Sequence, residues 1–168
     1  VLQTLGKNKE AIQCFQTALS NDSRHAEIHF NLGTVFLEQG RFEEAKLSLQ
    51  ESVKIGPSNP EAHNNLGHAF LKLLNYDEAI KSFDLANTKN SQSKVLECFY
   101  RQQNFKGFFA RLESIKSFDQ CNLGVAAISA FVSSQLHQED PYPFCKLPLQ
   151  FLKISHLKDR IEDWEALI

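Results

Sequence analysis

The chain has 168 residues, of which 42% are hydrophobic and 23% charged, the balance of a protein that buries a core. Its formal net charge of −2 offers no basic surface, which argues against nucleic acid or an anionic membrane surface as a partner. The longest apolar run, residues 123–136, contains three serines and a glutamine and is too short to span a bilayer.

Helical periodicity runs through the first half of the chain. Residues 8–19 are predicted to form one helix and residues 26–39 the next, because apolar side chains recur at the spacing of an amphipathic helix. Gly40 is predicted to end the second of these in a left-handed cap. A third helix is predicted over residues 42–55, where Gly56-Pro57 ends it, since proline cannot continue a helix. The two-residue turn between these helices forces them to lie antiparallel.

The segment 26–59 matches the segment 60–93 without a gap, so the sequence repeats itself at a fixed period. The second copy therefore predicts helices over residues 61–73 and 76–88. Self-similarity of this kind is typical of stacked repeat arrays, which act mostly through an extended surface. Ten positions are identical in the two copies: Glu27/Glu61, His29/His63, Asn31/Asn65, Leu32/Leu66, Gly33/Gly67, Phe36/Phe70, Leu37/Leu71, Glu44/Glu78, Ala45/Ala79 and Ser48/Ser82.

This pattern resembles that of the tetratricopeptide repeat (TPR) family. The family has Leu-Gly in the first helix, an aromatic residue three positions later, and alanine and an aromatic residue in the second helix. The matching positions here are Leu32-Gly33, Phe36, Ala45 and Leu49, then Leu66-Gly67, Phe70, Ala79 and Phe83. The resemblance implies an all-α fold: an α-α superhelix of stacked antiparallel helix pairs, a TPR-like solenoid with C-terminal capping helices. Gly33 and Gly67 are expected to let neighbouring helices approach closely.

The predicted array occupies residues 1–118. It holds the second half of one repeat, in which Gly6 aligns with Gly40, full repeats over 26–59 and 60–93, and a degenerate repeat over 94–118 with a shortened first helix at 95–101. Residues 119–168 are predicted to contain a capping helix over 122–136, a proline-rich loop over 137–148, and short helices over 149–156 and 159–167. This last region is a candidate linker to a further domain.

A polar row recurs on the first helix of each repeat, on the side away from the apolar stripe. In TPR arrays the first helices line a concave groove, so the resemblance places both rows in that groove. Lys72 is the only cation in the two rows, so a basic clamp for an acidic tail is not expected. The rows are Glu27, Asn31, Thr34 and Glu38, then Glu61, Asn65, His68 and Lys72.

Asn31 and Asn65 are the principal peptide-binding candidates. An Asn amide offers two donors and an acceptor, which matches the amide of a peptide backbone. A ladder of Asn at this position resembles peptide-binding arrays such as the repeat region of the O-linked N-acetylglucosamine transferases. The other candidates are expected to set specificity, and they are Thr34, His68, Asn64, Lys72, Glu27 and Glu61.

The leading functional hypothesis is a scaffold that binds a protein or extended peptide segment in its concave groove. One alternative is the N-terminal recognition region of a larger enzyme, a glycosyltransferase or an iron/2-oxoglutarate oxygenase, with its catalytic domain beyond Ile168. Residues 138–149 resemble the linker after the repeats in bacterial proteins that carry such domains. A structural spacer or self-associating array is a further alternative, as is a solvated polar face without a ligand. The sequence does not fix the oligomeric state.

No catalytic residue, metal or cofactor is predicted for this stretch of chain. It has no glycine-rich phosphate loop and no H-E-x-x-H motif, and no further ligand completes a site around His25 and His29. The four cysteines are widely spaced, as expected for free thiols in a reducing compartment, which predicts a cytoplasmic location. The chain lacks methionine and begins at Val1 in mid-pattern, so we expect a piece of a longer protein.

Overall fold

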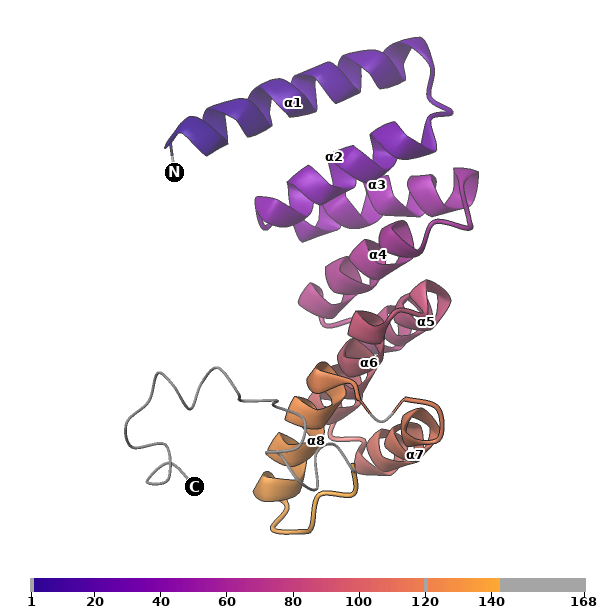
Figure 1. Cartoon of the computed structure of the whole chain (residues 1–168). Helices are drawn as coiled ribbons and strands as arrows, with labels where there is room; N and C mark the ends of the chain where they lie inside the picture. Colours follow the sequence, from indigo (N-terminus) through magenta and orange to yellow (C-terminus); the bar gives the residue numbers. More distant parts are fainter. Residues whose placement is uncertain (1, 120, 143–168) are drawn as a thin grey trace, which may run out of the picture.

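The structure, a computed structural model, describes residues 2–119 and 121–142, with side chains from residue 8 onward. These residues form eight α-helices and no strand, which confirms the predicted all-α fold of stacked helix pairs. The helices follow one another along the stack, from α1 at one end to α7 and α8 at the other (Figure 1). Their bounds are α1 Leu2–Asn21, α2 Ala26–Glu38, α3 Phe42–Ile55, α4 Pro60–Lys72, α5 Tyr76–Ala86, α6 Lys89–Arg101, α7 Phe105–Lys116 and α8 Leu123–Gln135.

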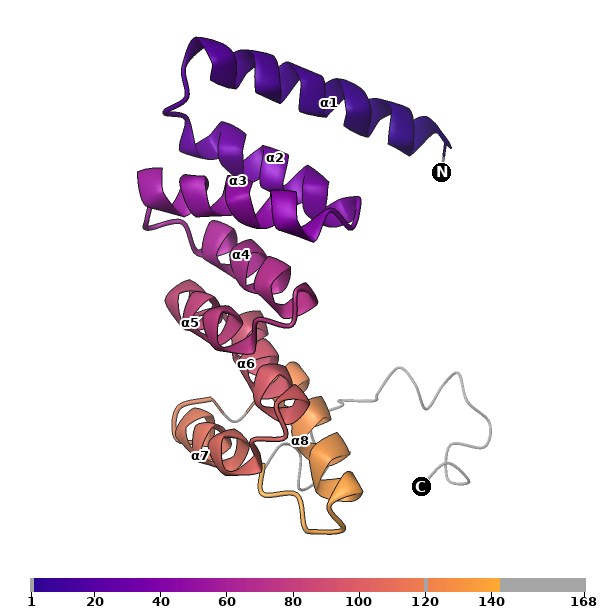
Figure 2. The same ribbon diagram turned by 180° about the vertical axis from the view of Figure 1, so that it is seen from behind.

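The helices form two layers. In both Figure 1 and Figure 2, α4, α6 and α8 lie on one side of the stack, and α5 and α7 lie on the other. We call α2, α4, α6 and α8 the first-helix layer, and α1, α3, α5 and α7 the second-helix layer. From α1 to α7 each helix contacts the next one along the chain, and within the first-helix layer α2 also contacts α4 and α6 contacts α8. Every such contact is therefore between neighbours, as in a solenoid.

Glycine sets the distance between the two layers. A Cβ atom on Gly33 would lie 2.5 Å from Cγ of Leu49, and one on Gly67 would lie 2.7 Å from two ring carbons of Phe83. Leu49 and Phe83 are fully buried, so the first and second helices of each pair touch where the sequence predicted close approach. Any larger residue at these glycines has to push the layers apart.

Two apolar clusters fill the space between the layers. The first runs from Ile12 of α1 to Cys98 of α6, with Phe36, Phe70 and Phe83 among its members. The second is built on Leu96 of α6 and continues through α7 and α8 to Tyr142; its buried members are Leu96, Phe108, Leu112, Ile115, Val125, Val132 and Tyr142. Phe99 of α6 packs against both clusters, so the core is continuous along the stack.

Each first helix ends in the same turn. One residue takes a left-handed conformation, and the next backbone N–H donates to a carbonyl five residues back in the helix. This closure satisfies one of the carbonyls left free at a helix end. The left-handed residues are Gly40 (φ 73°), Leu74 (φ 62°), Gln103 (φ 57°) and His137 (φ 52°). The first and last intervals between them are equal, and the interval from Leu74 to Gln103 is shorter.

The two repeated histidines tie the loops between helix pairs to the first-helix layer. His29 Nε2 donates to the Ser23 carbonyl at 3.0 Å, and His63 Nε2 donates to the Pro57 carbonyl at 2.8 Å. In both cases the acceptor lies six residues earlier, in the loop before the helix. These histidines are therefore structural, which agrees with the packing position that they occupy in the repeat.

Two of the expected helix bounds were wrong. The predicted shortened helix over 95–101 is α6, whose 13 residues equal the lengths of α2 and α4. A capping box, in which Thr88 accepts from Ser91 N–H and Ser91 Oγ accepts from Thr88 N–H, begins α6 well before Lys94. As a result α5 stops at Ala86. The division of the chain into units, including a unit over 94–118, stays a prediction.

The first helix is also longer than predicted. Gly6 lies inside α1, which spans 20 residues from Leu2 where the sequence predicted a helix over 8–19. Glycine permits a left-handed turn without requiring one, so alignment with Gly40 was a weak guide to the local backbone.

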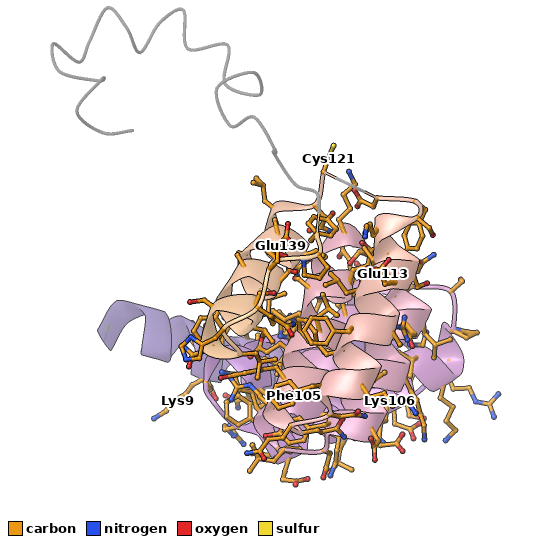
Figure 3. All side chains as sticks on the ribbon, turned by 90° about the horizontal axis from the view of Figure 1, so that it is seen from below. Lys9, Phe105, Lys106, Glu113, Cys121 and Glu139 are labelled. Atoms are coloured by element: carbon orange, nitrogen blue, oxygen red, sulfur yellow. The ribbon has the colours of Figure 1, made fainter. Side chains whose placement is uncertain are left out.

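The chain after α8 folds back along it. Glu139 lies between the end of α8 and the Cys121 side of the molecule in Figure 3. Tyr142 then reaches the beginning of α8, where its hydroxyl donates to the Asp119 carbonyl at 2.7 Å and accepts from Asn122 N–H at 3.2 Å. Residues 137–142 therefore form irregular chain as predicted, while the rest of the predicted loop and both short helices lie outside the described residues.

We predict that Gly67→Ala destabilises the protein by about 1–3 kcal/mol, although alanine is the better helix former. The new methyl group would enter the space of the Phe83 ring. Chemical denaturation measures the effect. In the double variant Gly67→Ala/Phe83→Leu the two losses should sum to less than their separate values. Full additivity would show that the glycine does not set this contact.

We predict that Leu74→Gly stabilises the protein by about 0.5–1 kcal/mol, because glycine adopts a left-handed conformation without the steric cost that a Cβ atom brings. Leu74 is 64% exposed, so little burial is lost. The matched control is Leu85→Gly, since Leu85 is 66% exposed and lies inside α5. The midpoint temperature of thermal unfolding should rise for Leu74→Gly and fall for Leu85→Gly.

Candidate functional site

The two predicted polar rows lie next to each other in the first-helix layer. Asn65 of α4 donates from Nδ2 to Thr34 Oγ1 of α2 at 3.1 Å, and Thr34 in turn donates to the Phe30 carbonyl at 3.0 Å. This bond links side chains 31 residues apart in the sequence. It leaves the Asn65 carbonyl oxygen without a hydrogen bond inside the described part of the chain. The rows from α2 and α4 thus form one polar surface.

A hollow of about 400 Å³ lies at the beginning of α2. Asn31 and Glu27 line it together with the ring of Phe30. The opposite side comes from Ser52 and Gly56 at the end of α3 and from the loop at Ser58. Asn31 is half-buried, and its amide makes no hydrogen bond to any described residue. Of the two repeated Asn residues, Asn31 therefore faces the open hollow and Asn65 is partly engaged.

The remaining predicted residues differ in their surroundings. Asn64 is half-buried, and its Oδ1 is fully covered without a hydrogen-bond donor among the described residues. Glu61 and Lys72 are exposed, and neither joins an ion pair within that part of the chain. The structure therefore brings Thr34 and Asn65 together, leaves Glu61 and Lys72 at the surface, and withdraws the Asn64 oxygen from it.

His68 lies three residues after Asn65 on α4 and is half-buried. Its ring meets Phe83 edge-to-face, with centroids 5.3 Å apart. Burial lowers the pKa of His68, the nearby Lys94 and Lys72 lower it further, and Glu97 opposes them. Because the charged form is disfavoured by both burial and neighbouring cations, His68 is neutral at pH 7. The imidazole there is a neutral polar group rather than a cation.

The third first helix adds a charged group that the sequence reasoning missed. Glu97 of α6 accepts from Lys94 at 2.8 Å and from Arg101 at 2.8 Å and 2.9 Å. These contacts lower the pKa of Glu97 against its burial. Lys94 precedes Gln103, the left-handed residue after α6, by as many residues as Asn65 precedes Leu74, the left-handed residue after α4. The two residues therefore hold the same position in their helices. The sequence does contain a signal for this equivalence, because Asn104 directly follows its turn just as Asn75 directly follows the preceding one. The assumption of one fixed period led the prediction to overlook it.

The chemistry of the first-helix layer changes along the stack. Helix α2 contains Glu27 and Glu38 and no lysine or arginine, whereas α6 carries the Lys94–Glu97–Arg101 group. Helix α8 contains no charged residue. Its Phe131 is 50% exposed and touches Tyr100 of α6 edge-to-face, with centroids 5.5 Å apart. Successive helices therefore present carboxylate, amide and imidazole, ion-paired and apolar surfaces.

No group suited to covalent chemistry lies on this surface among the described residues. Burial raises the pKa of the Cys98 thiol to about 12, so that thiol is protonated at neutral pH and is a poor nucleophile. Among residues 2–119 and 121–142, no cluster of three His, Cys, Asp or Glu side chains is placed to hold a metal ion. Within the same ranges, no helix has both the length and the apolar character to cross a membrane.

Comparison with known proteins identifies the class of this scaffold. A family profile described as tetratricopeptide repeat matches residues 1–60 and 37–93, which together exceed half of the chain. The chain belongs to the tetratricopeptide repeat family, and its fold is that of a protein-interaction scaffold. A search of curated proteins found no match.

Solved structures share the fold at low sequence identity. A structure titled as MamA protein has a TM-score of 0.74 at 19% identity, over 95% of this chain and 89% of that one. A fragment of MamA from Desulfovibrio magneticus RS-1 has a TM-score of 0.57 at 20% identity, over 70% and 72% of the two chains. PilF of Pseudomonas aeruginosa has a TM-score of 0.63 at 21% identity, over 99% and 77%. These likenesses support the fold alone.

We predict that Lys94→Gln raises the pKa of His68 toward its ordinary value, because one of the two repelling cations is removed. An NMR titration of the His68 ring, assigned with His68→Gln, measures this. Lys106→Gln on α7 is the control and should leave the pKa unchanged. In the parent protein, stability should fall as the pH drops below the ordinary histidine pKa, because the unfolded chain then binds the proton more readily than the folded one. A flat stability profile that is identical in His68→Gln would contradict this assignment.

Proposed function

We propose that the chain binds an extended segment of a partner protein across the first helices α2 and α4. The observation that carries the proposal is the Asn65–Thr34 hydrogen bond, which joins the two repeated rows into one surface. Next to that bond, the Asn31 amide and the Asn65 carbonyl oxygen have no partner among the described residues. Amide groups without a hydrogen-bond partner on a half-buried surface favour binding of a peptide backbone, which offers matching donors and acceptors.

The repeat geometry supports an extended ligand. Asn31 and Asn65 occupy the same position in consecutive helix pairs, so their amides recur along the stack. Contacts to the ligand backbone would hold a segment regardless of its side chains. The six other residues proposed to contact the segment would then select among sequences: Thr34, His68, Asn64, Lys72, Glu27 and Glu61.

We further propose that this stretch of chain acts as a non-catalytic module in the reducing cytoplasm. The cysteines Cys14, Cys98 and Cys121 are free thiols, which supports a reducing compartment. The alternative of a recognition region attached to a catalytic domain gains no support from the described residues. The partner is a protein segment, without nucleic acid, a membrane surface or a cofactor.

The test uses a random peptide library displayed on phage and selected on the purified chain, followed by titration of the enriched peptides by fluorescence anisotropy. We predict that Asn31→Ala/Asn65→Ala weakens binding roughly tenfold or more, since each peptide hydrogen bond contributes about 0.5–1.5 kcal/mol. Gln50→Ala, on an exposed position of α3, is the control and should bind as the parent does. Unchanged affinity in a folded double variant would refute the proposal that the peptide binds across α2 and α4.

A further inference from the structure

We infer that the hollow beside α2 receives the side chain of a lysine or arginine of the bound segment. The inference rests on the proposed function and names the chemistry of one position in the ligand. The hollow's volume of about 400 Å³ lies at the small end of ligand pockets, which run from about 300 to 1,000 Å³. That is room for one long side chain rather than for a large cofactor.

The charge of the hollow favours a cation. Glu27 is its only charged lining residue, and among the described residues it has no ion-pair partner. Many carboxylates of the described residues are already paired with lysine or arginine, whereas Glu27 and its repeat equivalent Glu61 are not. The paired ones are Glu43, Glu44, Glu51, Glu78, Asp84, Glu97 and Glu113.

The neutral lining suits a long basic side chain as well. The ring of Phe30 offers an aromatic face for a cation, and the free Asn31 amide offers an oxygen as acceptor. Helix α3 ends at Ile55, so its negative carbonyl end lies at Gly56 on the edge of the hollow. The positive ends of α2 and α4 lie there too, since Asn59 on the edge of the hollow is the N-cap of α4, but Glu27 and Glu61 stand in the first turns of these helices and offset them.

The charges on α6 disfavour a basic side chain at that end of the first-helix layer. On α6, Lys94 and Arg101 share the single carboxylate of Glu97, which leaves that region with a net positive charge. A basic side chain would be repelled there and accommodated at Glu27. The amides of Asn31 and Asn65 between these regions are neutral and impose no charge of their own.

The test starts from the same phage selection, and enriched peptides are expected to carry a lysine or arginine at a fixed position. One enriched peptide is then synthesised with its basic residue and with citrulline or glutamine in that place. We predict that Glu27→Gln lowers the affinity for the basic peptide by roughly five- to tenfold, which is the scale of one partly exposed charge-assisted contact. The affinity for the neutral peptide should not change. Glu10→Gln, which removes an exposed carboxylate from α1, is the matched control and should change neither affinity.

The outcomes separate this inference from the proposed function. If Asn31→Ala/Asn65→Ala weakens every peptide but Glu27→Gln weakens basic and neutral peptides alike, the hollow is not a cation site and the groove stands. If selection enriches acidic or apolar peptides without a basic residue, the inference is overturned in the same way. If no peptide is enriched, or the double Asn variant binds normally, the proposed function falls and this inference falls with it.

Discussion

The array depends on the contact between a glycine backbone and a large apolar side chain inside each central helix pair. At Gly67 the first helix lies directly against the ring of Phe83, and at Gly33 it lies against Leu49. These contacts fix the distance and the rotation of the first helix relative to the second. Because both glycines occupy the same position in the repeat, the polar faces of α2 and α4 turn to the same side, where Asn65 donates to Thr34. The position of the polar face is therefore a consequence of packing at the opposite face.

The turn that closes each first helix keeps that rotation in register along the chain. Its left-handed residue is Gly in only one of the four described turns, so the surrounding structure imposes the conformation on Leu74, Gln103 and His137. The interval from Leu74 to Gln103 is shorter because α5 ends early and α6 begins almost at once, while the α6–α7 pair keeps its own geometry. A shorter α5 and a shorter loop after it thus put Lys94 in the position that Asn holds in the two preceding first helices.

The fold and the general position of the rows follow from the sequence because both depend on local spacing. The repeat period can be read directly from the sequence, and the apolar stripes and the close approach of Gly67 to Phe83 involve residues within a single repeat. The structure agrees with all three. The beginning of α6 was missed because Thr88 and Ser91 are weaker signals than Gly56-Pro57, and the fixed period took precedence over them. The Asn65–Thr34 bond and the hollow join residues from different helices. Their geometry depends on how the helices pack, which sequence periodicity does not encode.

Repetition and variation have different physical consequences on this surface. The amides of Asn31 and Asn65 offer an extended chain the same contact in consecutive helix pairs. Such contacts do not depend on the order of charged side chains along that extended chain. The differences between helices supply a direction: an unpaired carboxylate on α2, the Lys94–Glu97–Arg101 group on α6, and exposed Phe131 on α8. Charges already paired on α6 lose solvation when covered, and Glu27, which has no ion-pair partner among the described residues, gains one. A segment held by the repeated amides would therefore be oriented by the ends of the row, where the surfaces of α2, α6 and α8 differ.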